Sequence, residues 1–346
     1  MMGDRLPVRV VVLLLAMGAF LTPACALIAT SSPSPPIISP SPAPAPATSA
    51  TDSPTPTSRR PATPTTETST TFAIIGDYGR DNDSEAAVAN LVTSWNPAYI
   101  VSVGDGYYAP AGGTGASKYD ESTGAYYCRW LAGITTTGRR CPGGLAQKNA
   151  FFPAMGNHDY SDARPSPDTY LTYFDLPGKG FVNTSGNERF YDFVQGPIHF
   201  FVLDSDAHEP AGTSSTSAQA RWLREQLAAS TSQWNIVCDH HPPFSSDNDH
   251  GSTAALQWPF ADWGADAVIS GHAHTYERVM RDGIVYFVNG LGGAPRYNFT
   301  TPVAGSAARY NSNWGAQQVT VTPTSLTFAF YSIDGSLIDN YSIPTK

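Results

Sequence analysis

Carboxylates, an amide and imidazoles recur directly after short apolar runs of this sequence. The runs are "FAIIGDYG", "YIVSVGDGYY", "FFPAMGNHD", "WNIVCDHH" and "AVISGHAH". Seven side chains at their ends can bind a metal ion: Asp77, Asp105, Tyr108, Asn157, His240, His272 and His274. Oxygen and imidazole ligands without a thiolate suit iron, zinc or manganese. Seven ligands exceed the needs of one ion and a carboxylate can bridge two, so the pattern predicts a pair of ions and phosphoester chemistry.

The elements around these residues predict an α/β fold. Uninterrupted apolar runs indicate strands buried on both faces. Residues 83–95 have a helical pattern, with Ala87, Leu91 and Trp95 expected to face the core, and Ser217 is expected to cap a second helix. Such sheets bind ligands beyond the carboxyl ends of their strands. Since all five polar clusters follow strand ends, we expect them to converge.

The carboxyl-terminal part has a different pattern. Residues 316–343 alternate apolar and polar side chains between turns at "TPTS" and "DGS". This alternation predicts an antiparallel meander that belongs to a second sheet.

The blocks "GDYG", "GDGYY", "GNHD", "VCDH" and "GHAH", in this order, resemble the five signature blocks of the calcineurin-like metallophosphoesterases. The tyrosine three residues after the aspartate of "GDGYY" resembles the purple acid phosphatase branch, in its short, tartrate-resistant acid phosphatase-like form. The likeness covers nearly all of residues 72–346. It implies a four-layer α/β/β/α sandwich with two mixed β-sheets.

The resemblance also divides the seven ligands between two ions. It implies an Fe(III) site formed by Asp77, Tyr108 and His274. It implies a second site, for divalent iron, zinc or manganese, formed by Asn157, His240 and His272. Asp105 is implied as the bridge between the ions.

The activity implied by the resemblance is that of an acid phosphatase. A small phosphomonoester would be attacked in line by a metal-bound hydroxide. His158 and His250 are implied as catalytic residues that contact the phosphate or protonate the departing alcohol. One alternative is a phosphodiesterase or nucleotide hydrolase of the same fold. Another, from a different class, is a surface-tethered binding protein without catalysis.

Several of these residues also have purely structural interpretations. Asp77 and Asp105 could cap helices that follow their strands, a frequent role of aspartate. His241 and His199 are interpreted as hydrogen-bonded imidazoles of the core. Asp204, at the end of the run "FFVLD", is interpreted as structural.

The amino-terminal part predicts export. Two arginines precede the apolar run "VVVLLLAMGAFL" and a stretch of small residues, which is the order of a secretory signal. The run is shorter than the roughly 20 residues that span a bilayer. Residues 1–26 therefore predict a cleaved signal, without a membrane span in the mature chain, and Cys25 leaves a lipid anchor open as an alternative. We expect a secreted or surface-attached protein with a disordered Pro/Ser/Thr-rich linker at 27–71 and one catalytic domain at 72–346.

The net charge excludes one class of binding partner. The net charge is −9, which argues against a general nucleic-acid binder, since that function needs a basic face.

In an exported protein, Cys128 and Cys141 are expected to form a disulfide within the insertion 111–148. Cys238, inside a predicted strand, is expected to be a buried free thiol.

Overall fold

The computed structural model describes residues 69–108, 117–134, 144–160 and 166–346. The chain divides into two units, and all of these residues belong to the second, Pro64–Lys346. The predicted signal at 1–26 and nearly all of the predicted linker lie outside the described residues. Strand β1, Thr70–Ile75, includes the last two residues of that predicted linker. None of the helices in these described ranges combines the length and the apolar character needed to cross a bilayer.

Six strands form the first sheet, in the order β13-β12-β11-β1-β2-β3. Strands β1, β2 and β3 run parallel to one another, whereas β11, β12 and β13 form the antiparallel meander predicted from the sequence. The meander was expected in a second sheet, but β11 pairs with β1, so it extends the sheet of the first three strands. Besides β1, the strands are β2 (Ile100–Ser102), β3 (Phe151–Pro153), β11 (Gly315–Val321), β12 (Ser325–Ser332) and β13 (Leu337–Pro344). The first sheet is therefore mixed.

Seven strands form the second sheet, in the order β10-β8-β9-β7-β6-β5-β4. Its centre, β5-β6-β7-β9, is parallel, and its two edges are antiparallel. The strands are β4 (Tyr191–Gln195), β5 (Ile198–Val202), β6 (Trp234–Cys238), β7 (Ala267–Ser270), β8 (Tyr276–Arg281), β9 (Ile284–Asn289) and β10 (Ser306–Tyr310). Each sheet thus has a parallel section, and the loops after the carboxyl ends of its strands can bring polar side chains together.

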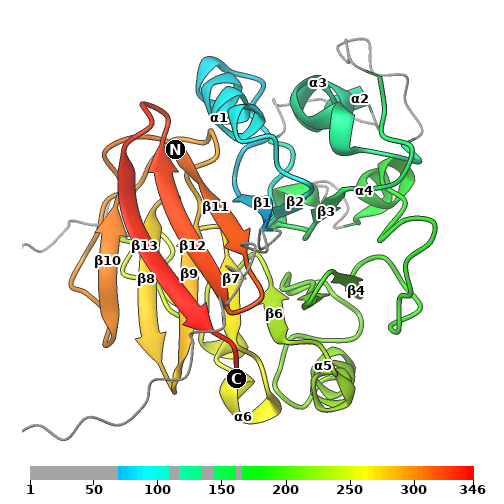
Figure 1. The fold of residues 1–346 in the computed structure, drawn as a ribbon, viewed down its shortest axis with the longest axis vertical. Helices are drawn as coiled ribbons and strands as arrows, with labels where there is room; N and C mark the ends of the chain where they lie inside the picture. Colours follow the sequence, from blue (N-terminus) through cyan, green and yellow to red (C-terminus); the bar gives the residue numbers. More distant parts are fainter. Residues whose placement is uncertain (1–68, 109–116, 135–143, 161–165) are drawn as a thin grey trace, which may run out of the picture. The chain divides into compact units, whose positions relative to one another are not determined.

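Helices pack against both sheets (Figure 1). Helix α1, Asp83–Ser94, lies against β11 of the first sheet. Helices α5, Ala218–Ala229, and α6, Phe260–Trp263, pack their apolar residues on the second sheet. A larger apolar core, rich in aromatic rings, lies between the sheets. The predicted four-layer α/β/β/α sandwich is therefore confirmed.

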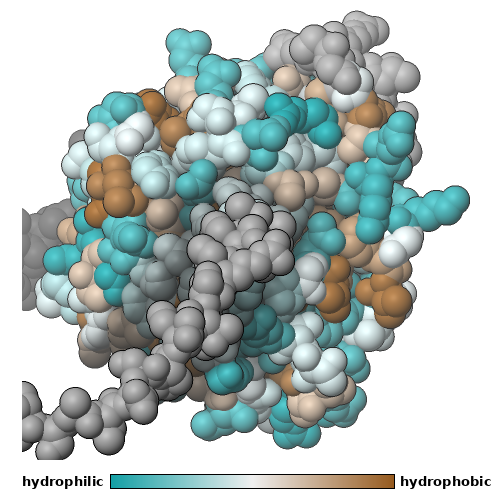
Figure 2. Space-filling view, viewed as in Figure 1, coloured by the Kyte–Doolittle hydropathy of each residue, from teal (hydrophilic) through white to brown (hydrophobic). Residues whose placement is uncertain are grey.

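Short helical segments complete the described chain. They are α2 (Ser117–Tyr119), the π-helical Asp120–Gly124, α3 (Ala125–Tyr127), α4 (Asp168–Tyr173) and the 3-10 turns Cys128–Trp130, Asn157–Asp159 and Ala254–Leu256. On the face drawn in Figure 2, apolar residues form separate spots among hydrophilic ones.

The predicted core face of α1 is wrong by one position. The residues that the helix buries are Glu85, Val88, Ala89 and Val92, whereas Leu91 and Trp95 are only partly buried. The reason is Glu85, whose Oε2 accepts the backbone N–H groups of Arg80 at 3.0 Å and Asp81 at 2.6 Å. These two bonds hold the Glu85 side chain inward, so the buried face of the helix includes this residue.

An ion pair ties the two sheets together near their edges. Arg278 of β8 donates from Nε to Asp339 Oδ2 at 2.7 Å and from Nη2 to Oδ1 at 3.1 Å, and Tyr276 Oη donates to Asp339 Oδ2 at 2.8 Å. Burial disfavours the ionised carboxyl, but the bonds from Arg278 and Tyr276 outweigh burial and hold the pKa of Asp339 below its ordinary value. A two-pronged, charge-assisted pair of this kind is stronger than an ordinary surface pair.

We expect Asp339→Asn to lower the free energy of unfolding at pH 7 by about 1.5–3 kcal/mol, the usual contribution of hydrogen bonds to a charged group. Because the folded pKa lies below the unfolded value near 4, this contribution is present above about pH 4 and is lost as pH falls through the folded pKa. Denaturant titrations of both proteins at pH 7 and near pH 3 measure the difference.

Asp282→Asn is the control for this prediction, because its pair with Arg281 is longer, at 3.7 Å, and exposed. It should change stability by less than about 1 kcal/mol. Equal stability of the wild type and Asp339→Asn at pH 7 would contradict the role given to this ion pair.

Candidate metal centre

The polar side chains singled out in the sequence follow the carboxyl ends of parallel strands. Asp77, Asp105 and Asn157 come after β1, β2 and β3 of the first sheet, and the imidazoles come after β6 and β7 of the second. Helix α1 is capped by Asn82, whose Oδ1 accepts the N–H of Glu85 at 2.9 Å. The capping interpretation of Asp77 is therefore wrong.

Three of these side chains meet in a first cluster. Tyr108 Oη lies 3.2 Å from Asp77 Oδ1 and 3.1 Å from His274 Nε2. His274 Nε2 lies 3.4 Å from Asp77 Oδ1. All three side chains are buried. The residues that the resemblance assigns to Fe(III) thus present their ligand atoms to one another.

A second cluster lies next to the first. His240 Nε2 lies 3.1 Å from Asn157 Oδ1 and 3.4 Å from Asp105 Oδ1, and the His272 ring centroid is 5.0 Å from that of His240. One ligand atom each from Asp77, Asp105 and His240 lies within 4.8 Å of the others. Asp105 is therefore placed between the two clusters, as a bridging carboxylate must be.

Backbone carbonyl groups orient two of the imidazoles. His240 Nδ1 lies 2.8 Å from the carbonyl oxygen of Val103, and His274 Nδ1 lies 2.6 Å from that of Pro295. A carbonyl oxygen can only accept, so each Nδ1 carries the proton. The lone pair of each Nε2 then faces the centre, which is the usual arrangement of a metal-binding histidine.

Burial favours the neutral forms of these groups. It raises the pKa of Asp105 well above its usual range, and the charges of Asp77 and Asp159 add to this effect. Burial likewise raises the pKa of Tyr108 and lowers the pKa of both His240 and His272. Neutral imidazoles are ready to ligate, whereas a carboxylate and a phenolate at this depth need a nearby positive charge. The set of ligands therefore fits metal ions.

Glycines allow the strand-end loops to approach the centre closely. A Cβ atom on Gly156 would lie 2.1 Å from Asp105 Oδ1, and one on Gly271 would lie 2.7 Å from Asp77 Oδ2. Both contacts are far shorter than van der Waals distance. The glycine that precedes the ligand in "GNHD" and in "GHAH" is thus required by the position of a carboxylate from another loop.

The two predicted catalytic histidines lie beside the clusters and are exposed. The His158 ring centroid is 4.5 Å from that of Tyr108, and its backbone N–H donates to Asp105 Oδ1 at 3.0 Å. The His250 ring stacks on His272 with a centroid distance of 4.0 Å. The structure therefore brings all nine predicted site residues into one region.

Three buried carboxylates that hold the site loops were missed by the sequence analysis. Asp159 Oδ2 accepts the N–H groups of Gly156 at 2.7 Å and Asp105 at 3.1 Å. Glu277 accepts from the N–H of Ser246 at 2.7 Å, and Asp247 accepts from the N–H of His250 at 2.7 Å. Asp159 is the last residue of "GNHD", and Glu277 lies three residues after "GHAH". Their closeness in sequence to the predicted ligands was the available signal.

The structural interpretations of the other residues have mixed outcomes. Asp204 accepts a hydrogen bond from Tyr160, and Cys238 is a buried free thiol, both as expected. Cys128 is disulfide-bonded, and Cys141 lies outside the described residues. His241 is hydrogen-bonded as expected, with Nδ1 2.8 Å from Ser205 Oγ, but it is partly exposed rather than fully in the core. Its ring centroid is 4.4 Å from that of His272.

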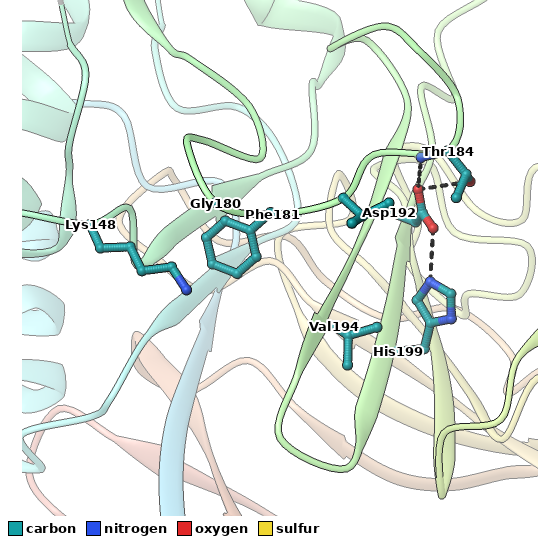
Figure 3. A pocket seen from close by; sticks show the side chains of 8 residues that line it. Lys148, Gly180, Phe181, Thr184, Asp192, Val194 and His199 are labelled. Atoms are coloured by element: carbon teal, nitrogen blue, oxygen red, sulfur yellow. Dashed lines mark hydrogen bonds and ion pairs between the residues drawn. The ribbon is translucent and has the colours of Figure 1, made fainter.

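A pocket of about 320 Å³ is lined by none of the predicted site residues (Figure 3). Its lining residues are Lys148, Gly180, Phe181, Val182, Thr184, Asp192, Val194 and His199. Inside it, Asp192 accepts from Thr184 Oγ1 at 2.9 Å and from His199 Nε2 at 2.9 Å. Because these polar groups already bind one another, the pocket is a weaker candidate site than the centre, and His199 is hydrogen-bonded as expected.

Similarity to known proteins agrees with this geometry. The model of the calcineurin-like phosphoesterase family matches residues 70–276. Two parallel-strand sections that deliver carboxylate, amide and imidazole ligands to one point define a metallophosphoesterase. The chain belongs to the calcineurin-like phosphoesterase family.

Within that family, the similar proteins include purple acid phosphatases. Purple acid phosphatase 15 of Arabidopsis thaliana is 27% identical over 251 residues, which cover 64% of this chain and 44% of the plant protein. Tartrate-resistant acid phosphatase type 5 of Mus musculus is 25% identical over 82% of this chain and 92% of the mouse protein. An uncharacterized protein of Mycobacterium tuberculosis is 31% identical, but the match covers only 28% of its length.

The fold agrees with a solved structure from the same group. A purple acid phosphatase from yellow lupin superposes over 80% of this chain and 54% of its own, with a TM-score of 0.61 and 16% sequence identity. The chain thus spans about half of this protein and of the Arabidopsis relative. At this level of identity, the superposition shows the shared fold.

We expect Gly156→Ala to lower the metal content of the purified protein sharply, because the new Cβ would displace the Asp105 carboxylate. Elemental analysis measures the metal, and thermal unfolding shows whether the variant remains folded. Gly186→Ala is the control. Its φ of 72° makes alanine strained there by about 1 kcal/mol, but no atom lies within 4 Å of the added Cβ. Equal metal loss in both variants would mean that destabilisation, rather than the Asp105 contact, is the cause.

Proposed function

We propose that this protein is an exported phosphatase that hydrolyses phosphomonoesters at a centre of two metal ions, one ferric and one divalent. The position of Asp105 is the observation that carries the proposal. Its Oδ1 lies 3.4 Å from His240 Nε2, and its carboxylate also approaches the cluster of Asp77 and Tyr108. The similarity to purple acid phosphatases supports the choice of substrate and metals.

The ferric assignment rests on Tyr108. Burial and two neighbouring carboxylates raise the pKa of this phenol, so a phenolate here needs strong positive charge. A trivalent ion supplies more of that charge than zinc or manganese(II) does. Iron, zinc and manganese all remain open for the divalent position, where the predicted ligands are an amide and two imidazoles with a shared carboxylate.

The protein's own residues would bind and protonate the substrate. When bound, the metal ions would supply a nucleophile from water and positive charge for the phosphoryl group. His158 and His250 are both exposed next to the clusters, so either can offer an N–H to a phosphoryl oxygen. The backbone bond from His158 to Asp105 fixes the position of its loop, and this histidine is our choice for the proton donor to the departing alcohol.

Export is the part of the proposal that rests on sequence alone. The order of charged, apolar and small residues in 1–26 supports a secretory signal. Amino-terminal sequencing of the mature protein tests it. A start after about residue 26 without a lipid supports secretion, whereas a lipidated Cys25 would support attachment to the cell surface.

The activity test compares two esters. We expect p-nitrophenyl phosphate to be hydrolysed faster than bis(p-nitrophenyl) phosphate, and faster turnover of the bis ester would instead favour a phosphodiesterase. Asp105→Ala should remove both metal and turnover, because the bridge is lost. If metal disappears from this variant while the activity of the preparation does not change, that activity comes from elsewhere and the non-catalytic alternative gains support.

A visible spectrum tests the ferric assignment. The resemblance to purple acid phosphatases predicts a colour from charge transfer between phenolate and Fe(III). Tyr108→Phe should abolish that absorption. Tyr107→Phe is the matched control, since Tyr107 is the neighbouring buried tyrosine and its Oη has no hydrogen-bond partner among the described residues. Colour that survives in Tyr108→Phe would exclude Tyr108 as the source.

A further inference from the structure

His241 lies next to two of the predicted metal ligands, and no role has been assigned to it so far. Its ring centroid lies 5.0 Å from that of His240 and 4.4 Å from that of His272. One ring nitrogen from each of these three histidines lies within 4.8 Å of the others. Distance alone would therefore admit His241 as a further metal ligand, and the hydrogen bonds around it must decide.

Ser205 fixes the protonation of the His241 ring. Ser205 Oγ accepts the backbone N–H of His240 at 3.2 Å and that of His241 at 3.0 Å. These two bonds use both lone pairs of the hydroxyl oxygen. Ser205 Oγ also lies 2.8 Å from His241 Nδ1, so the hydroxyl proton must be donated to that nitrogen. His241 Nδ1 is consequently an acceptor, and the proton of the neutral ring resides on Nε2.

This arrangement is the opposite of that in the proposed ligands. His240 and His274 donate from Nδ1 to carbonyl oxygens and keep the Nε2 lone pair free. Ligation by His241 Nε2 would place a proton on Nδ1, and Ser205 could accept it only by releasing one backbone N–H. Loss of a buried hydrogen bond is unfavourable, so the network selects against His241 as a ligand.

The Nε2–H of His241 has no hydrogen-bond acceptor among the described residues. The side chain is partly exposed, and its ring contacts that of His272, with 4.4 Å between the centroids. An N–H held in place in this way is suited to an anionic oxygen. A prepositioned donor of this type needs no reorganisation when charge develops in a reaction.

We infer that His241 is a neutral hydrogen-bond donor, through Nε2–H, to a phosphoryl oxygen of the ligand, and not a metal ligand. This inference rests on the proposed function in one respect, namely that the centre binds phosphate. It adds to that function a phosphate-binding residue, positioned by Ser205, beside His240 and His272, which would hold the second ion.

The first experiment measures orthophosphate affinity and metal content in the zinc-loaded protein. We expect His241→Phe to retain its metal and to bind orthophosphate roughly 10- to 100-fold more weakly by calorimetry, the range for hydrogen bonds to a charged group. His241→Gln retains an N–H donor and should lose less affinity. His208→Phe, a change at an exposed histidine with a 55% exposed side chain, serves as the control and should change neither quantity.

The second experiment reads the protonation of the ring directly. Imidazole nitrogen shifts of the diamagnetic, zinc-loaded wild type should show His241 protonated on Nε2 and unprotonated on Nδ1. This measurement needs no variant, so it decides even if His241→Phe does not fold. A protonated Nδ1 would overturn the inference, as would loss of metal in a folded His241→Phe or unchanged phosphate affinity in both variants.

These outcomes separate the inference from the proposed function. A wild type that binds phosphate but hydrolyses neither ester would refute the phosphatase, while the variants would still decide the role of His241. A wild type that hydrolyses the monoester, with His241 variants of normal phosphate affinity, would refute only the inference. A wild type that binds no orthophosphate would overturn the inference.

Discussion

Two carboxylates, Asp77 and Asp105, are almost completely buried within a few ångströms of each other, and the rest of the site is arranged around this constraint. Buried like charges repel, and each loses its hydration. Backbone N–H groups offset part of this cost, from His272 to Asp77 and from His158 to Asp105. The remaining charge requires cations at this point, which explains why imidazoles with free lone pairs arrive from the opposite sheet.

The same constraint explains the unusual backbone at the strand ends. Asp77, Asp105 and His272 have φ values of 57°, 55° and 66°, in the left-handed region that non-glycine residues avoid. All three residues are proposed ligands that directly follow or nearly follow a strand. A left-handed residue bends the chain sharply at the point where the strand has ended. Strain at functional positions of this kind persists because the surrounding structure fixes it.

Much of the site was predictable because buried strands have an unambiguous sequence pattern. The runs that end at Asp77, Asp105 and Asn157 are uninterrupted, so both the strands and the polar residues at their ends could be located. The sequence pattern could not predict which face of a helix is buried or which hydrogen bonds a side chain makes. The buried face of α1 includes Glu85, and this depends on backbone N–H groups that no periodicity reveals. Likewise, the different partners of the two adjacent imidazoles in "DHHPP" cannot be seen in the sequence: Nδ1 of His240 faces the carbonyl oxygen of Val103, whereas Nδ1 of His241 faces the hydroxyl of Ser205.

The insertion 111–148 illustrates how tertiary contacts reveal a role that the sequence pattern does not. Its described residues make hydrogen bonds to the loops that carry the predicted ligands. Tyr119 Oη donates to Asp159 Oδ1 at 2.8 Å, and Ser122 Oγ donates to the carbonyl of Gly106 at 2.7 Å. Asp159 in turn accepts a hydrogen bond from the backbone N–H of Asp105, so this part of the insertion helps to hold the Asp105 loop in position.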